Sequence, residues 1–127
     1  MGAILVDNGK ILCAQRGESK TLKHLWEFPG GKIESGETPQ EALIRELQEE
    51  LLIEVEVQTE QFEETSYQYD FGLVHLTTFI CLLKNGTPQL TEHIAVQWLN
   101  PEELNKLEWA PADIPAVEKL IEMGTII

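Results

Sequence analysis

The stretch from residue 38 to residue 51 constrains the fold most, because it combines a helix-start signal with an apolar stripe. Thr38 offers a hydroxyl for the N-cap, Pro39 suits the first helical position, and Glu41 completes a capping box. Apolar side chains then recur every three or four residues, at Ala42, Leu43, Leu47 and Leu51. The pattern predicts an amphipathic helix that begins at Thr38 and packs this stripe against a core.

The same segment concentrates acidic side chains. Glu46, Glu49 and Glu50 are spaced so that a helix projects them together, on a flank different from the apolar stripe. Arg45 is the only cation between residues 39 and 52, so the lysine partners usual on a solvated acidic face are missing. Like charges so placed repel by a few tenths of a kcal/mol per pair. A hard cation such as Mg²⁺ or Mn²⁺ would relieve that repulsion, which favours a metal site over a solvated acidic surface.

A longer pattern surrounds these acids. Gly31 and Glu37 precede the run Arg-Glu-Leu-Gln-Glu-Glu at 45–50, and residues 25–32 read Leu-Trp-Glu-Phe-Pro-Gly-Gly-Lys. The whole pattern resembles the signature of the Nudix hydrolases, and residues 25–32 resemble its MutT-like branch. One position departs, because the family usually has glycine two residues after the paired glutamates, where this chain has Leu52. Leucine there either strains a left-handed turn by ~1 kcal/mol or ends the helix differently.

The resemblance implies an α+β fold of the Nudix type, an α/β/α sandwich with a mixed β-sheet between helices. It also implies an enzyme that uses Mg²⁺ or Mn²⁺ to hydrolyse phosphoanhydride bonds. We assign Glu49 and Glu50 to metal coordination, with the carbonyl of Gly30 as an additional ligand by resemblance. Glu46 is a shared ligand or the general base. Glu92 matches a position from which some members supply a further ligand or the base, so the choice of base stays open.

The implied reaction converts a (deoxy)nucleoside triphosphate to its monophosphate and pyrophosphate. The implied substrates are an oxidised purine nucleotide such as 8-oxo-dGTP, or a cytidine triphosphate, and the role is sanitation of the nucleotide pool. Two alternatives remain open at this point. One is a hydrolase of another nucleoside diphosphate-linked compound, and the other is a module that senses nucleotides without cleaving them.

Two supporting residues and one bystander are expected around the acids. Arg45 can grip carboxylates with its planar guanidinium and so orient its neighbours. Glu37 is its expected partner and serves as structural support, holding the loop against the helix. His93 lies beside Glu92, but a lone loop histidine is more often a bystander than a base.

Base recognition is expected to involve Phe28 and Asp113. Phe28 either packs against a nucleobase or is a core aromatic. Proline at 115 favours a helix over residues 115–123 with Ile114 as its N-cap, which leaves Asp113 just outside and not needed as a cap. MutT-like members place asparagine or aspartate at this position against the base. An ionised aspartate only accepts hydrogen bonds, so it suits a guanine edge as well as the cytosine amino group.

The net charge of −13 argues against a polymeric nucleic acid partner, since such proteins need basic stripes. A single nucleoside triphosphate remains compatible if metal ions neutralise its phosphates. Arg16, Lys20, Lys23 and Lys32 are four of the five cations in the first quarter of the chain. Arg16, at a strand end, and Lys32, beside the glycine pair, are the candidates for substrate contact.

Length and composition predict one domain over residues 1–127, with 43% apolar content for a globular core. No apolar run approaches the ~20 residues that span a bilayer, and no secretory leader is visible, so the expected location is the cytoplasm without a membrane partner. Cys13 and Cys81 are expected to be reduced core residues. The sequence carries no signal for an oligomeric state.

The remaining elements follow from turns and alternation. Asn-Gly at 8–9 predicts a hairpin between strands at 2–6 and 11–14, followed by a polar loop over 18–25. Further strands are predicted at 53–57, 61–69, 73–83 and 94–99, with a helical turn at 101–106. Strands before, between and after two helices predict a mixed sheet covered by helices.

Overall fold

The computed structural model describes residues 1–18 and 21–124. Lys20 and part of the predicted loop over 18–25 therefore lie outside the described residues. The elements follow in the order β1 (Gly2–Asp7), β2 (Lys10–Gln15), β3 (Trp26–Glu27), α1 (Pro39–Leu51), β4 (Glu54–Tyr69), β5 (Gly72–Asn85), β6 (Ala95–Leu99), the 3₁₀ helices η1 (Pro101–Lys106) and η2 (Pro111–Asp113), and α2 (Ile114–Met123).

The strands form one mixed sheet in the order β3-β2-β1-β5-β4, and β6 also pairs with β2. Strand β1 runs antiparallel to β2 and parallel to β5. The predicted first hairpin is confirmed, because Asn8 and Gly9 take φ values of 52° and 76°, as a tight two-residue turn requires. β1 thus becomes a central strand with both faces covered.

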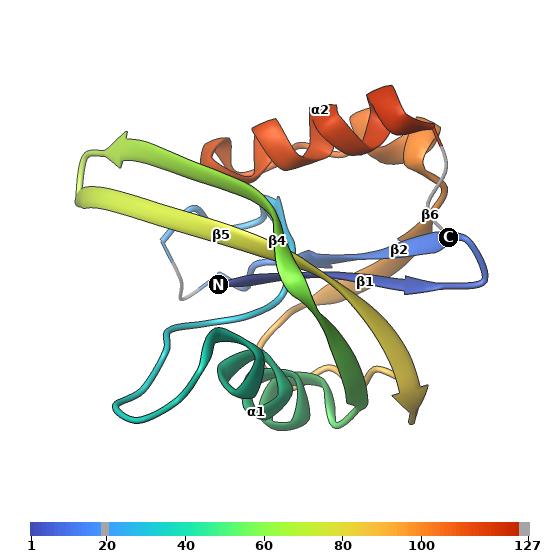
Figure 1. Ribbon diagram of the computed structural model, residues 1–127. Coiled ribbons are helices and arrows are strands. Elements are labelled where there is room, and N and C mark those ends of the chain that lie inside the picture. The colour runs from blue at the N-terminus through green and yellow to red at the C-terminus, as the bar shows by residue number, and fades with distance from the viewer. Residues whose placement is uncertain (19–20, 125–127) are drawn as a thin grey trace.

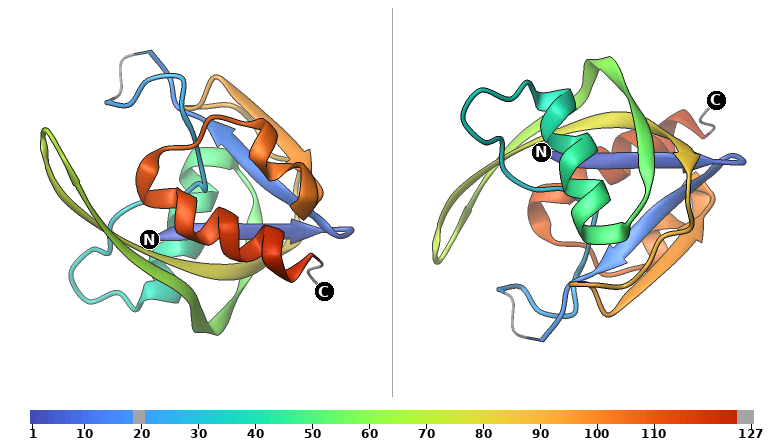
Figure 2. Two further views of the ribbon diagram at one scale, coloured as in Figure 1. Left: turned by 90° about the horizontal axis from the view of Figure 1, so that it is seen from above. Right: turned by 90° about the horizontal axis from the view of Figure 1, so that it is seen from below.

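The two α-helices cover opposite faces of the sheet, as Figure 1 and the views from above and below in Figure 2 show. Alternate residues of β1 point to the two faces. Ile4 and Val6 pack in the core on the α2 side, whereas Ala3 and Leu5 pack in the core on the α1 side. The α1 core contains the predicted stripe residues Leu43, Leu47 and Leu51. The predicted α/β/α sandwich is confirmed.

Helix α1 begins as predicted and ends in a left-handed turn. The Thr38 hydroxyl accepts a hydrogen bond from the Glu41 N–H at 3.1 Å, and the Glu41 carboxylate accepts one from the Thr38 N–H at 2.8 Å. At the other end Leu52 adopts φ 58° and ψ 40°, and its N–H donates to the Gln48 carbonyl. The chain therefore keeps the turn that glycine normally makes, with the strain that a leucine brings to it.

Strand β4 differs from prediction. The separate strands predicted at 53–57 and 61–69 are one continuous strand, because bulges absorb the break in alternation. Its register against β5 shifts between Val57 and Gln61 and again between Gln61 and Glu63. Beyond these shifts the outer halves of β4 and β5 form an arm that projects from the sheet (Figure 1). We call residues 64–77 the hairpin arm.

Smaller boundary differences affect the other elements. The last strand begins at Ala95 instead of residue 94, and the two-residue strand β3 was not predicted. The predicted start of the last helix is wrong by one residue: Ile114 is not the N-cap but the first residue of α2, with φ −56° and ψ −44°. The 3₁₀ helix η2 already sets a helical path before it, which overrides the bias against helical angles before proline.

Two further expectations can be compared with the structure. Cys13 and Cys81 are free and buried as predicted, and burial raises the pKa of each thiol to about 12. Within the described residues, neither α-helix is long and apolar enough to cross a lipid bilayer.

Candidate active site

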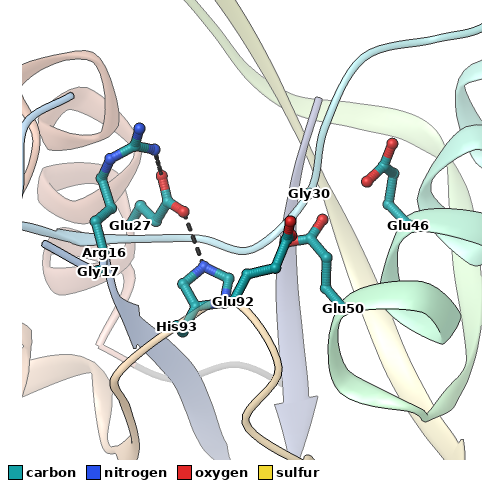
Figure 3. A pocket seen from close by; sticks show the side chains of 8 residues that line it. All are labelled: Arg16, Gly17, Glu27, Gly30, Glu46, Glu50, Glu92 and His93. Carbon is teal, nitrogen blue, oxygen red and sulfur yellow. Dashed lines mark hydrogen bonds and ion pairs between the residues drawn. The ribbon is translucent and has the colours of Figure 1, made fainter. Parts of the chain in front are cut away.

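A pocket rich in carboxylates opens between α1, the segment after β3 that contains Gly30 and Gly31, and the loop before β6 (Figure 3). We call it the acidic pocket. Four glutamates, one arginine and one histidine contribute to it. Its lining residues are Arg16, Gly17, Glu27, Gly30, Glu46, Glu50, Glu92 and His93.

Glu50 carries the strongest electrostatic signal in the acidic pocket. It is only 7% exposed, although the sequence placed it on a polar flank of the helix. Burial raises its pKa to about 9, with further contributions from a hydrogen bond with Glu46 and the charges of Glu46, Glu92 and Glu27. A carboxyl group with this pKa is protonated at neutral pH unless a compensating cation is bound beside it.

The donor set suits a hard divalent cation, because carboxylate oxygens are the ligands that Mg²⁺ and Mn²⁺ prefer. In the described part of the chain, however, no three carboxylate, imidazole or thiolate groups already stand in metal-ligand geometry. A cation would therefore have to draw the glutamates of the acidic pocket together. The raised pKa of Glu50 indicates that the positive charge of a cation would be stabilised there.

The two glycines beside the pocket are required by close approach. A Cβ atom on Gly31 would overlap the carboxylate of Glu46, and one on Gly30 would overlap the backbone of Met1. Gly30 lines the pocket and forms an isolated bridge with Gly2, the first residue of the central strand β1. The glycine pair thus lets the chain pass between β1 and the acidic face of α1.

Arg45 organises the carboxylates behind the pocket. Its Nε and Nη2 donate to the two Glu37 oxygens at 2.7 and 3.0 Å, so the predicted Arg45–Glu37 pair is present and bidentate. Nη1 donates to Glu46 Oε1 at 2.9 Å, and Nη2 also donates to the Lys32 carbonyl at 3.1 Å. The hydrogen bonds that Arg45 donates to Glu37 and Glu46 raise its pKa. The guanidinium therefore holds Glu46 in place from behind.

Two predicted residues lie outside the acidic pocket. The side chain of Glu49 is 60% exposed and lies 3.4 Å from Arg45 Nη1, so only Glu46 and Glu50 of the predicted trio line the pocket. Arg45, one turn earlier, attracts Glu49 toward the outer flank of the helix. Lys32 is exposed, and its recorded contact is the carbonyl that Arg45 binds.

Glu92 reaches the acidic pocket from the segment between β5 and β6. The preceding Thr91 hydroxyl donates to the backbone carbonyl of Glu50, which ties this segment to the last turn of α1. Figure 3 shows the side chains of Glu92 and Glu50 entering the same pocket from these two elements. The structure thus brings Glu92 to the helix acids, as the predicted role requires.

Sequence reasoning missed two residues of the acidic pocket. His93, expected to be a bystander, has a side chain only 4% exposed, and its Nε2 lies 2.9 Å from Glu27 Oε2. Glu27 also lies 2.6 Å from Arg16 Nη1 through Oε1. Burial would raise the pKa of Glu27, but the hydrogen bond from His93 and the charge of Arg16 outweigh it and lower that pKa. The available signal was alternation, which puts Glu27 opposite the buried Trp26 and Phe28.

A second cleft adjoins the acidic pocket. We call it the outer cleft; it lies between the hairpin arm, the segment after β2 and η2. Its lining residues are Arg16, Thr21, Leu22, Glu27, Tyr69, Phe71, Val74, Leu76, Ala110, Ala112 and Asp113. Arg16 and Glu27 line both cavities, so one site can run through both.

Asp113 is the buried acid of the outer cleft. It is 6% exposed, and Oδ2 accepts a hydrogen bond from the Phe28 N–H at 2.9 Å. Burial raises the pKa of Asp113 to about 7 despite this hydrogen bond. Asp113 itself occupies the N-cap position of α2 and does not lie outside it as predicted, but its side chain makes no capping bond, in keeping with the expectation that it is not needed as a cap. Close by, the Tyr69 hydroxyl accepts from the Ala112 N–H at 2.8 Å, which fastens the hairpin arm to η2.

Phe28 lies in the core instead of the outer cleft. Its side chain is 3% exposed, and its ring centroid lies 4.8 Å from that of Trp109. Of the two readings of Phe28, the structure thus favours the core aromatic. The backbone of Phe28, however, orients Asp113.

The sizes of the two cavities indicate the size of a ligand. The acidic pocket measures about 160 Å³ and the outer cleft about 220 Å³. Each is smaller than the roughly 300 Å³ at which ligand pockets begin, whereas together they exceed it. The arrangement therefore suits an elongated ligand with a highly charged end in the acidic pocket and a less polar end in the outer cleft.

Comparison with known proteins agrees with this geometry. The model of the NUDIX domain family matches residues 1–120. The chain is 40% identical over 123 residues to the CTP pyrophosphohydrolase of Escherichia coli K12, covering 97% of this chain and 90% of that protein. It is 35% identical over 122 residues to the 8-oxo-dGTP diphosphatase of the same strain, covering 94% and 92%.

Among solved structures, one similar chain is the DNA mismatch repair protein MutT, described as a Nudix hydrolase, from methicillin-resistant Staphylococcus aureus 252. It shares 51% identity with a TM-score of 0.76, over 97% of this chain and 94% of that chain. The chain therefore belongs to the Nudix hydrolase family. Within this family, its similarity to these relatives shows that the chain is a hydrolase of the MutT-like type.

Proposed function

We propose that this protein is a divalent metal-dependent nucleoside triphosphate pyrophosphohydrolase. It cuts between the α and β phosphates and releases the monophosphate and pyrophosphate. The observation that carries this proposal is the junction of an acidic pocket with a less polar cleft through Arg16 and Glu27. A nucleotide has the matching division into a charged end and a base.

The carboxylates of the acidic pocket are the proposed metal ligands. Glu46, Glu50 and Glu92, with the carbonyl of Gly30, would hold Mg²⁺ or Mn²⁺, and Glu49 joins them if its side chain turns inward from Arg45. When bound, the metal neutralises phosphate charge and makes a water more acidic. The raised pKa of Glu50 supports this assignment, because a buried acid cluster is stabilised when a cation enters it.

The proton of the attacking water needs a base. Glu46 and Glu92 both line the acidic pocket, so both remain candidates. Arg45 orients Glu46 by its 2.9 Å hydrogen bond. Glu37 fixes Arg45 in turn, so its proposed role is structural support.

The outer cleft is the proposed base site. Asp113, with a pKa near neutrality, can present either an acceptor or a donor to a base edge. Both an 8-oxo-dGTP and a cytidine triphosphate suit this chemistry, and relatives named for each substrate resemble the chain. The proposed role is removal of such nucleotides from the pool. Arg16 is placed to contact the phosphate nearest the nucleoside, and Lys32 remains a candidate for the outer phosphates.

The experiment is product analysis across a substrate panel. The full chain is incubated with Mg²⁺ and, separately, CTP, dCTP, dGTP, 8-oxo-dGTP, a nucleotide sugar and a dinucleoside polyphosphate. We expect a monophosphate and pyrophosphate from at least one triphosphate, and no turnover in excess EDTA. Release of a nucleoside diphosphate and orthophosphate would refute the proposed cleavage between the α and β phosphates. Cleavage of the conjugates alone, or tight binding without turnover, would instead identify the other hydrolase or the sensing module.

A further inference from the structure

Three side chains, Arg16, Glu27 and His93, form a chain along the acidic pocket (Figure 3), and Arg16 and Glu27 also line the outer cleft. Arg16, just past β2, lies 2.6 Å from Glu27 of β3, and the second oxygen of Glu27 lies 2.9 Å from His93 Nε2. Each oxygen of the carboxylate thus has its own partner. Because an ionised carboxylate only accepts hydrogen bonds, His93 must carry its proton on Nε2 and donate it.

Arg16 is held on its other side as well. Its Nε donates to the Thr21 carbonyl at 2.7 Å and its Nη2 donates to the Thr21 hydroxyl at 3.2 Å. With Nη1 on Glu27, the plane of the guanidinium is fixed from two directions. Arg16 and Glu27 line both cavities, so a nucleotide that spans the two cavities would pass beside this plane.

Burial of His93 costs free energy that packing alone does not explain. Its side chain is 4% exposed, and its Nδ1 is buried without a hydrogen-bond partner among the described residues. A buried polar atom without a partner destabilises the fold, and an apolar side chain would avoid that cost. Among the described residues, the ring hydrogen-bonds only to Glu27, which indicates that this bond is the reason for the histidine.

We propose that His93 is a positioning residue for substrate binding, acting through Glu27 on Arg16. His93 fixes the Glu27 carboxylate, and Glu27 then aims the Arg16 guanidinium at the phosphate nearest the nucleoside. This inference rests on the proposed function and adds to it two residues that the acidic signature does not contain. It assigns them to binding of the triphosphate, not to its cleavage.

The test compares KM and kcat for the triphosphate that the panel identifies. In His93→Ala the Glu27 carboxylate loses its second anchor, so we expect KM to rise roughly tenfold, as for loss of one charge-assisted hydrogen bond, with kcat within about threefold. His93→Gln puts an amide N–H near the position of Nε2 and should restore KM. His93→Asn places its amide near Nδ1 and should not. A histidine needed only for packing would be replaced equally well, or equally badly, by both amides.

A double variant tests whether the effect passes through Arg16. If it does, Arg16→Ala with His93→Ala should have the KM of Arg16→Ala alone, because the second change then has nothing left to disturb. Additive effects would overturn the proposal, as would an unchanged KM in His93→Ala. His75→Ala is the matched control, since His75 is an exposed histidine on the hairpin arm, paired with Ser66. Its KM should equal that of the original protein.

Two measurements keep the result interpretable. Thermal melting identifies a variant that fails to fold, and the His93→Gln and His93→Asn pair then decides the question. Affinity for CMP and 8-oxo-dGMP, measured by calorimetry in all variants, reports positioning without turnover. If the original protein cleaves no triphosphate, the proposed function fails, while a binding loss in His93→Ala that His93→Gln repairs still supports the positioning role. Equal affinities throughout would overturn it.

Discussion

The acidic pocket and the outer cleft share two residues but are specified in different ways. Two of the four acids of the pocket, Glu46 and Glu50, lie four residues apart on α1, and Arg45 of the same helix fixes Glu46 through a 2.9 Å ion pair. The outer cleft gathers its lining from the hairpin arm, η2 and the segment after β2. The helix acids of the acidic pocket are therefore positioned by residues close to them in sequence, whereas the outer cleft depends on how distant segments pack together.

The comparison predicts its largest effect at Glu50. We expect Glu50→Gln to lower kcat by at least roughly a thousandfold, because it removes a charged metal ligand from the acidic pocket. Folding should be intact, since the amide has the same shape. Glu49→Gln is the matched change at an exposed neighbour and should cost about tenfold or less. Equal losses in steady-state kinetics would show that the two glutamates are not divided as the structure has them.

A second substitution, at Gly31 of the backbone beside the pocket, tests the position of Glu46. In Gly31→Ala the added methyl group overlaps the Glu46 carboxylate and must displace it. A misplaced catalytic group of this kind costs roughly a hundredfold in kcat/KM. Affinity for nucleoside monophosphate should change much less, since the outer cleft is not touched. Undiminished turnover would mean that the position of Glu46 is unimportant.

The raised pKa of Glu50 predicts how the metal-free protein responds to pH. Its folded pKa of about 9 exceeds the ordinary 4.5, so the folded state binds more protons between these values and stability falls as pH rises through them. In Glu50→Gln this contribution is absent. Relative to the original protein, the free energy of unfolding of the variant should therefore rise by about 1–3 kcal/mol between pH 5 and pH 9. Urea unfolding in EDTA measures this difference. A pH-independent difference between the two proteins would contradict the burial of an acid at this site.

Asp113 tests the other end of the site. Asp113→Ala should shift the ratio of kcat/KM between cytidine and 8-oxoguanine triphosphates by roughly tenfold, the value of one or two hydrogen bonds to a base edge. The EDTA sensitivity and the Mg²⁺ concentration for half-maximal rate should stay the same. If the ratio is unchanged over the whole panel, Asp113 does not read the base.

The smallest expected effect is on stability alone. Leu52 is 50% exposed and holds a left-handed conformation at the end of α1. Leu52→Gly should stabilise the protein by about 0.5–1 kcal/mol, because glycine adopts these angles without steric strain. Leu52→Ala keeps the strain and should bring no gain. Thermal melting compares the two, and equal melting temperatures would show that the turn is unstrained.

Local signals predicted the parts of the molecule that local chemistry decides. The capping box at Thr38 and the Asn8-Gly9 turn are recognised within a few residues, so both elements were predicted where they occur. The apolar stripe of α1 gave the core face. These features determine the sandwich and the position of the acids, because the helix can pack in only one way.

Tertiary contacts decide what the sequence could not show. His93 meets Glu27 across a separation of 66 residues, and no spacing rule links them. The orientation of Glu49 follows from a competition for Arg45 that only side-chain positions reveal. The start of α2 depended on η2, which continues into it. These side-chain contacts, in the acidic pocket as well as at η2, were therefore the part of the site least accessible from sequence.

The register shifts near Gln61 give the hairpin arm a particular kind of evolvability. Because the extra residue at a bulge is unpaired, its loss would make the pairing regular and leave every later side chain of β4 on its present surface. The ring contact between Tyr69 and Phe71 would be kept. A single codon deletion there could thus change the bend of the hairpin arm without reversing the side chains that face the nucleobase, while the reaction chemistry, anchored on α1, stays untouched.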